Sequence, residues 1–260
     1  PMTGGDSLAG FHPLVRDWFT SRFSAATPVQ EATWPRIVAG EHVLITAPTG
    51  SGKTLTAFLA AINAFVEGRW ETGATRVLYV SPLKALNNDI HRNLLAPLAE
   101  LRELAARTGF EMPDVSVATR SGDTPQQERR RMLKRPPEIL ITTPETLNII
   151  LTSPRARSIV STVRTVILDE VHAVVGEKRG THLITAVERL TLLAGEFQRI
   201  AVSATVRPLE LVARFIGGYA LEGDPGEDAA YRPRDVSVVR VEDTKRVELS
   251  VDFPNTDEEL

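Results

Sequence analysis

Short apolar runs alternate along the chain with longer segments in which apolar residues recur every three or four positions. Runs of four or five apolar residues suit strands buried on both faces, and the longer periodicity suits helices. The alternation predicts an α/β fold, a parallel sheet flanked by crossover helices. Ligands in such open sheets bind beyond the carboxyl ends of the strands. The expected strands are 43–46, 76–80, 115–118, 139–142, 165–168 and 199–202, with helical periodicity at 54–66 and 83–107.

The texture of the chain changes after Gly217 and Gly218, where Asp, Glu, Pro and Gly become frequent. The alternating segment 236–253 that follows could be a strand pair or a connector. We therefore expect an N-terminal segment at 1–40, a main domain at 41–220 and a short C-terminal connector at 221–260.

Composition narrows the class of protein without identifying the ligand. With 42% hydrophobic and 24% charged residues in 260, the chain can form one large α/β domain or two small ones. A net charge of −3 argues against a wholly basic nucleic-acid coat, although a local stripe of Lys and Arg could still bind phosphates. The lack of cysteine excludes disulfides, thiolate zinc sites and a Cys nucleophile, which fits a cytoplasmic location. No signal peptide or membrane span is expected. Pro1 before Met2 suggests a piece of a longer protein.

The segment 44–54 reads as a strand, a tight turn and the start of a helix. Gly50 and Gly52 let the backbone wrap an anion, so that N–H groups of the turn, which also contains Thr49 and Ser51, can point at phosphate oxygens. Lys53 would reach the β- and γ-phosphates of ATP, and the Thr54 hydroxyl would bind Mg²⁺. The alternative is a Gly-rich turn with an incidental Lys.

Two adjacent carboxylates, Asp169 and Glu170, follow the apolar strand at 165–168. Asp169 suits a Mg²⁺ contact through water, because Mg²⁺ prefers hard oxygens and keeps much of its hydration. Glu170 can orient the attacking water as a general base. Taken alone, Asp-Glu after a strand is more often a helix N-cap or a solvated loop. His172 is either a packing histidine or a link from the nucleotide to neighbouring loops.

Together these segments resemble the superfamily 2 helicases, whose first domain is a RecA-like phosphate-loop NTPase. Ala47 to Thr54 matches motif I, Asp169-Glu170-Val171-His172 matches motif II, and Ser203-Ala204-Thr205 matches motif III. The resemblance implies that Ser203 and Thr205, with His172, couple ATP to the nucleic acid. The segment 23–30 resembles the Q motif, in which Gln30 would read the adenine edge.

Three further segments resemble the loops that hold the nucleic-acid backbone in that superfamily. They supply Ser81 and Lys84, Thr119, and Thr142 with Thr143. Hydroxyls, backbone N–H groups and one Lys can hold phosphates without reading sequence. Single threonines at strand ends are nevertheless more often caps or turn formers. The basic run of Arg129, Arg130, Arg131, Lys134 and Arg135 could contact nucleic acid or form a solvated helix face.

Within the superfamily, the DEVH box followed by 173–183, and the stretch 119–131, are most similar to the large helicase-related (Lhr) family. That resemblance implies an ATP-dependent translocase that moves 3′ to 5′ on single-stranded DNA, unwinds duplexes including RNA:DNA hybrids and acts in DNA repair. It also implies that a second RecA-like domain supplies arginines to the ATP site. The rival interpretations are a nucleotide-dependent switch, an RNA helicase of the same superfamily and a phosphate-loop kinase.

Overall fold

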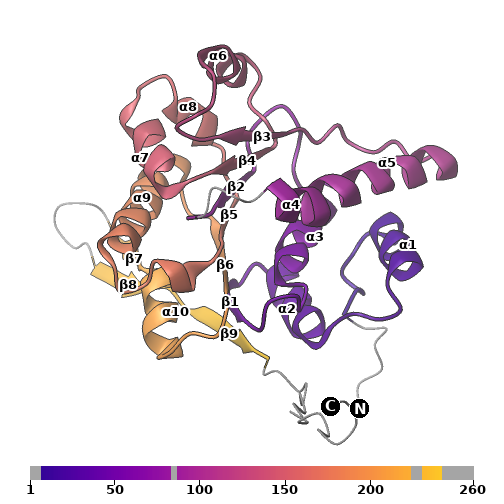
Figure 1. Ribbon diagram of the computed structural model, residues 1–260, viewed down its shortest axis with the longest axis horizontal. Coiled ribbons are helices and arrows are strands. Elements are labelled where there is room, and N and C mark those ends of the chain that lie inside the picture. The colour runs from indigo at the N-terminus through magenta and orange to yellow at the C-terminus, as the bar shows by residue number, and fades with distance from the viewer. Residues whose placement is uncertain (1–6, 83–86, 224–229, 242–260) are drawn as a thin grey trace, which may run out of the picture.

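A seven-stranded parallel sheet forms the centre of the molecule. The computed structural model describes residues 7–82, 87–223 and 230–241. In Figure 1 the sheet runs from top to bottom between two groups of helices, in the strand order β3-β4-β2-β5-β6-β1-β9. The strands are β1 His42–Thr46, β2 Val77–Val80, β3 Val117–Arg120, β4 Ile139–Thr142, β5 Thr165–Leu168, β6 Gln198–Ser203 and β9 Val236–Arg240. The α/β fold expected from the sequence is confirmed.

Helices cover both faces of the sheet and bury a hydrophobic core on each. One face carries α1 Pro13–Arg22, α2 Pro28–Val38, α3 Lys53–Val66, α4 Asn87–Ile90, the π-helix η1 His91–Leu95 and α5 Ala96–Thr108. The other carries α6 Gln126–Lys134, α7 Pro144–Thr152, α8 Arg157–Val160, the 3₁₀ turn η2 Val171–Ala173, α9 Lys178–Ala194 and α10 Leu209–Gly217. Among the described residues, no helix has the length and apolar content needed to cross a membrane.

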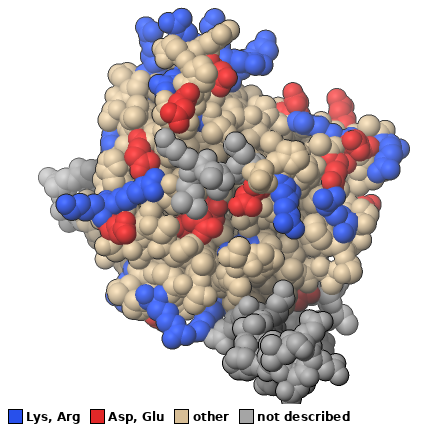
Figure 2. Space-filling view, in the orientation of Figure 1, with Lys and Arg blue, Asp and Glu red and all other residues tan. Residues whose placement is uncertain are grey.

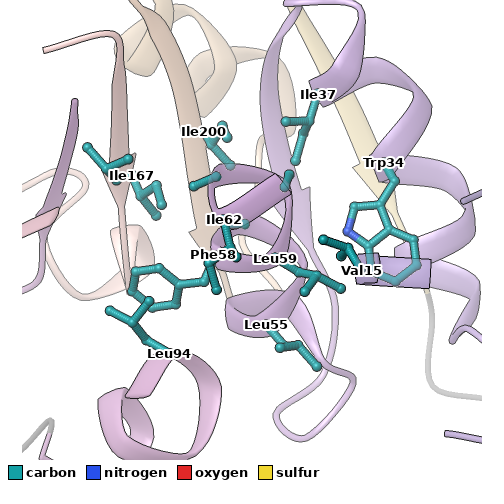
Figure 3. Packing of buried hydrophobic residues seen from close by; sticks show 14 of the residues in the cluster. Val15, Trp34, Ile37, Leu55, Phe58, Leu59, Ile62, Leu94, Ile167 and Ile200 are labelled. Carbon is teal, nitrogen blue, oxygen red and sulfur yellow. The ribbon is translucent and has the colours of Figure 1, made fainter. Parts of the chain in front are cut away.

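Helix α3 is buried on all sides, every residue from Leu55 to Val66 included. A helix that is apolar all round belongs inside a protein, and each large side chain buried there stabilises the fold by about 1.5–3 kcal/mol. Figure 3 shows Phe58 and Ile62 between the sheet and the outer helices. The ring of Phe58 stacks on Tyr79 of β2 with 4.9 Å between centroids. This packing fixes the start of α3 relative to the carboxyl edge of the sheet.

Strand β3 starts later than its apolar run predicts. The sequence favoured a strand at 115–118, but the ladder to β4 pairs Val117 with Ile139 and ends at Arg120 and Thr142. Before this ladder, the backbone N–H of Ser116 donates to a carboxylate oxygen of the buried Glu138 (2.7 Å). The apolar run therefore indicates which residues are buried. The ladder begins only after Ser116, whose N–H is bonded to the Glu138 side chain.

The helix expected over 83–107 is divided, and residues 83–86 lie outside the described part of the chain. The backbone N–H of Ala96 donates to the carbonyl of His91, five residues earlier, before α5 continues with regular geometry. Pro97 follows at once and has no N–H to offer a carbonyl of the preceding turn. The wider turn lets the helix continue despite this missing donor.

The chain returns to the sheet after the boundary expected near residue 220. Two antiparallel strands, β7 Tyr219–Glu222 and β8 Ala230–Pro233, form a separate pair. Strand β9 then lies parallel to β1, from His42 beside Val236 to Thr46 beside Arg240. The segment 221–260 is therefore not only a connector, because part of it completes the sheet. Its role as a lead toward a second domain stays a prediction.

A buried ion network ties α9 and α10 to the amino end of β6. The Arg199 side chain is fully buried and donates to Glu188 (2.7 Å) and to the carbonyls of Ile216 and Gly217 (3.0 and 2.8 Å). Arg234 donates to the same Glu188 (3.0 Å) and to Glu196 (2.7 Å). Several partners on each guanidinium offset the cost of removing the charges from water.

Candidate nucleotide site and nucleic-acid interface

The turn between β1 and α3 has the backbone geometry that an anion cradle requires. Gly50 and Gly52 adopt positive φ angles of 82° and 88°, a region that residues with a Cβ rarely occupy. Gly52 is the N-cap of α3 and makes no side-chain capping hydrogen bond. The N-cap residue therefore offers no side chain to the N–H groups in the first turn of α3. This end of a helix attracts anions. Thr49 and Ser51 lie in the same turn, between β1 and α3.

Lys53 bends back over this turn. Its ammonium donates to the carbonyls of Ala47 and Pro48 at 2.5 and 2.6 Å. Burial lowers the pKa of Lys53, while the nearby carboxylates of Glu170 and Asp169 oppose that shift. The sequence places these carboxylates over a hundred residues away, and the fold brings their charges to the lysine.

The N-terminal segment also reaches the turn. Thr27 and Gln30 form a capping box at the start of α2, in which the side-chain oxygen Oε1 of Gln30 accepts from the backbone N–H of Thr27 (2.8 Å). The Thr27 hydroxyl donates to the carbonyl of Ser51 (2.9 Å). A Cβ on Gly52 would lie only 2.9 Å from the Gln30 amide nitrogen, so the glycine also permits this approach. The Gln30 side chain is thus held against the phosphate turn.

Asp169 lies at the carboxyl end of β5, buried beneath the turn. One carboxylate oxygen accepts a short hydrogen bond from the Tyr79 hydroxyl, and the other accepts from the backbone N–H of Glu170 (2.9 Å). Burial raises the pKa of Asp169 to about 6, although both hydrogen bonds act in the opposite direction. Mg²⁺ would favour the ionised form, because a dication strongly stabilises an adjacent carboxylate.

Glu170 has the one positive φ among the described residues other than glycine (φ 49°, ψ 42°). A left-handed conformation costs a residue with a side chain on the order of 1–3 kcal/mol and is found at functional sites. In this conformation the Glu170 side chain reaches His172. The carboxylate then lies 3.2 Å from Nδ1 of His172 and stays partly exposed.

His172 links this acidic pair to the end of β6. Its Nδ1 accepts a hydrogen bond from the backbone N–H of Ala204 (3.1 Å), between Ser203 and Thr205. The Thr46 hydroxyl donates to the Ala204 carbonyl (3.2 Å), which joins β1 to the same segment. Ser203 is buried and Thr205 is exposed. The same Nδ1 lies 3.2 Å from the Glu170 carboxylate, so it either accepts from Ala204 or, when it carries a hydrogen, donates to Glu170. The two contacts are therefore alternatives at one atom.

The residues at this edge fit a nucleotide with Mg²⁺. The helix terminus and Lys53 supply donors for phosphate oxygens, and Thr54 and Asp169 supply the hard oxygen ligands that Mg²⁺ prefers. Of the adjacent pair Asp169 and Glu170, only Glu170 keeps a partly exposed carboxylate, as a general base requires. Among the described residues there is no cluster of three or more His, Asp or Glu side chains that could hold a metal ion.

The residues expected to hold nucleic acid follow strands β2, β3 and β4 at the same edge. Thr119 is exposed and Ser81 is buried, while Lys84 lies outside the described residues. The buried Thr142 hydroxyl donates to the Arg120 carbonyl (2.8 Å), and the Thr143 hydroxyl caps α7. These two threonines have the local structural roles that the sequence left open for them. Their binding to nucleic acid stays a prediction.

Two positioning residues escaped the sequence interpretation. The sequence indicates only that Tyr79 is part of a strand, yet its hydroxyl donates a hydrogen bond to the Asp169 carboxylate. Arg179 of α9 donates to the Pro82 carbonyl (2.7 Å) and to the Glu145 carboxylate (2.6 Å). It therefore joins the two loops that carry Ser81 and Thr143. The available signals were a polar Tyr inside an apolar strand and an Arg just beyond the acidic box.

A phosphate-binding turn facing an Asp-Glu pair across the carboxyl edge of a parallel sheet defines a phosphate-loop nucleotide-binding domain. Comparison with known proteins agrees with this class and narrows it. The family description "DEAD/DEAH box helicase" matches residues 27–212, and the chain belongs to that family.

The relatives include several Lhr helicases. An ATP-dependent helicase Lhr-Core protein 2 of Thermococcus barophilus is 49% identical over 92% of this chain and 27% of its own length. An Lhr helicase/probable uracil glycosylase of Mycolicibacterium smegmatis is 52% identical over 84% of this chain and 14% of its own length. The similarity to Lhr helicases expected from the sequence is confirmed. The chain spans about a quarter or less of these relatives.

Among solved structures, the chain is similar to Mycobacterium smegmatis helicase Lhr bound to ssDNA and AMP-PNP. The TM-score is 0.79 at 48% identity, over 91% of this chain and 28% of that one. The seven-stranded sheet flanked by helices thus has the RecA-like form expected from the sequence.

Proposed function

We propose that this chain is the ATP-binding half of an ATP-driven motor that moves along single-stranded nucleic acid. The observation that carries the proposal is the convergence of the 49–54 turn, Gln30 and the Asp169-Glu170 pair at one edge of the sheet. Predicted backbone-gripping segments follow neighbouring strands at that edge. Nucleotide and strand would therefore bind side by side.

Each residue has a distinct role in the proposed ATP hydrolysis. The first turn of α3 and Lys53 bind phosphate oxygens, Thr54 and Asp169 hold the Mg²⁺, and Gln30 orients the adenine. Bound Mg²⁺ neutralises the phosphate charge that develops during phosphoryl transfer. Glu170 accepts the proton of the attacking water, and its contact with His172 couples hydrolysis to the segment 203–205.

The track is proposed to be single-stranded DNA, with movement 3′ to 5′, unwinding of duplexes that include RNA:DNA hybrids, and a role in DNA repair. The similar Lhr structure is bound to ssDNA and AMP-PNP, which supports the ligand class. In the parent protein, a second RecA-like domain would contribute arginines worth about 10³ to 10⁵ in turnover. The cytoplasmic location expected from the sequence belongs to the same proposal.

Glu170→Gln in a chain extended by the second domain tests this mechanism. The amide is nearly isosteric but cannot accept the proton, so ATP binding should remain while DNA-stimulated hydrolysis falls by a factor of about 10² or more. Binding is measured by calorimetry and turnover by phosphate release. Turnover within a few-fold of the parent would remove Glu170 as the base.

A second experiment separates a motor from a nucleotide-dependent switch. The 260-residue chain and the extended chain are compared for ATP turnover with and without single-stranded DNA, at the same salt. A motor predicts strong stimulation in the extended chain and weak turnover in the short one. Turnover that ignores DNA in both chains would favour the switch, and equal turnover in both would contradict the two-domain mechanism.

A further inference from the structure

A cleft of about 320 Å³ lies beside the edge strand β3, away from the nucleotide turn. Four of its lining residues are arginines: Arg120 at the end of β3, Arg129 and Arg130 on α6, and Arg155 in the turn between α7 and α8. The other described lining residues are polar and uncharged or apolar, and none is acidic. Figure 2 shows Lys and Arg side chains gathered at the top of the molecule, where Figure 1 places α6.

Arg120 is the least expected member of this set, because it is only 8% exposed. Its Nη1 has no hydrogen-bond partner among the described residues. Burial lowers the pKa of Arg120, and the positive charge of Arg129 adds to the effect. A buried guanidinium without an acidic partner is costly, and a bound anion would remove that cost.

Arg129 has a different task, because its Nε and Nη2 are already engaged. Nε donates to the Thr124 carbonyl (2.8 Å), and Nη2 donates to the carbonyl of Gly122 (2.7 Å). It thereby braces the loop that follows Thr119, one of the segments expected to hold nucleic acid. Arg129 both lines the cleft and supports this loop, so the cleft lies next to the loop.

The α6 residues that line the cleft lie at positions 126, 129, 130 and 133. Positions three, four and seven apart share one face of a helix. Arg131 lies on a different face and does not line the cleft. The exposed Arg130 and Arg155 approach from two separate segments of the chain, which leaves their donors available to an anion between them.

We propose that this cleft binds a backbone phosphate of the nucleic acid, next to the strand that the loops at Ser81, Thr119 and Thr143 hold. Several guanidinium groups converging on one space suit a phosphate, because their planar forks can donate to it in pairs. The inference rests on the proposed function and adds a contact outside the residues that the helicase resemblance supplied. It also divides the basic run of α6 into cleft residues and a solvated face.

The test replaces the two exposed cleft arginines in the double variant Arg130→Gln, Arg155→Gln. Its matched control, Arg131→Gln with Arg157→Gln, removes the same charge from α6 and α8 without touching the cleft. Binding of fluorescent single-stranded DNA to the 260-residue chain is measured by anisotropy across a salt series. Loss of one phosphate contact should reduce the slope of log K against log salt by about 0.7 in the cleft variant only.

The cleft variant should also bind the DNA about 3- to 10-fold more weakly at low salt, a loss of roughly 0.6 to 1.4 kcal/mol. Equal slopes and affinities in the cleft and control variants would overturn the inference. The single variant Arg155→Gln, which should show part of the slope change, repeats the test in case the double variant folds poorly.

A further arm separates a backbone phosphate from a free anion. Inorganic phosphate is titrated against the parent and the cleft variant while the thermal midpoint is followed. Protection that depends on the cleft, with unchanged DNA binding, would assign the cleft to a small anion and overturn the inference. If neither the unsubstituted 260-residue chain nor the chain extended by the second domain binds DNA, the proposed function and the cleft both fail. If the unsubstituted chain binds DNA, and the cleft variant has the same DNA affinity and salt slope as its control, the cleft alone fails.

Discussion

At the amino end of β6, the guanidinium of Arg199 is buried among four hydrogen-bond acceptors, whereas Lys53 and Glu170 at the carboxyl edge stay partly exposed. In the first arrangement protein groups accept from Nη1 and Nη2 of the guanidinium, while its Nε has no hydrogen-bond partner among the described residues. In the second, Glu170 adopts a strained backbone, and Lys53 bends back onto carbonyls of its own loop. The amino end is thus built to hold the fold, and the carboxyl edge leaves charges available for a ligand.

The largest expected effect breaks the amino end. Arg199→Met removes one of the two arginine partners of Glu188, leaves the Ile216 carbonyl without its donor and leaves the Gly217 carbonyl with Arg234 alone. The free energy of unfolding should fall by about 3–5 kcal/mol, as when one member of a buried ion pair is lost. Chemical denaturation measures it. The exposed Arg157→Met serves as the control, and a loss below about 1 kcal/mol would show that Arg234 alone can hold Glu188.

Lys53→Ala should reverse that pattern. Nucleotide affinity should fall by a factor of about 100 or more, about 2.7 kcal/mol, while the free energy of unfolding stays within about 0.5 kcal/mol of the parent. Calorimetry with Mg²⁺ and ATP gives the affinity. Lys178→Ala is matched to it, because Lys178 is also the first residue of a helix. Unchanged affinity for ATP would refute the phosphate turn.

Tyr79→Phe probes a residue that belongs to both kinds of region. The ring packs in the core, and the hydroxyl donates to Asp169. Losing that donor should cost about 1–2 kcal/mol in stability and weaken the Mg²⁺-dependent part of ATP binding, because Asp169 is less firmly oriented. Tyr219→Phe, on an exposed tyrosine, is the control. If Mg²⁺ raised the ATP affinity of Tyr79→Phe and of the unsubstituted chain by the same factor, Tyr79 would have only a packing role.

The smallest effect concerns the rim of the buried network. Glu196 lies at this rim and accepts a hydrogen bond from Arg234, which lowers the pKa of Glu196 below the ordinary 4.5. A lowered acid pKa means that the pair stabilises the fold above about pH 4.5 and loses this contribution as the pH falls through the folded value.

Glu196→Gln should therefore lower the thermal midpoint slightly at pH 7 and make no difference at strongly acidic pH. Partial exposure keeps the effect below about 1 kcal/mol. Thermal unfolding from pH 2 to 8 measures it, beside Glu210→Gln on an exposed face. A midpoint difference that is the same at every pH would indicate a cause other than the Glu196 charge.

The carboxyl edge could be predicted from sequence because its chemistry is local. A strand followed by Gly50, Gly52 and Lys53, or by Asp169 and Glu170, carries both the backbone geometry and the reactive groups within a few residues. The parallel sheet then brings the two segments to one edge.

The residues that position this edge could not be predicted in the same way. Tyr79 meets Asp169 across ninety residues, and Arg179 meets Pro82 across ninety-seven. No pattern within one segment specifies such pairs, since they depend on how helices and strands pack together. The prediction that a strand begins at Val115 was wrong for a related reason. Val115 is buried, but the ladder with β4 begins only at Val117.

Strand β9 has a consequence for any polypeptide that continues beyond it. It runs parallel to β1, and the backbone N–H of Val241 donates to the carbonyl of Thr46, directly before the phosphate turn. Paired strands lie about 4.8 Å apart. Whatever follows Val241 is therefore attached one strand's width from the start of the phosphate turn, and a displacement of the turn would reach it directly.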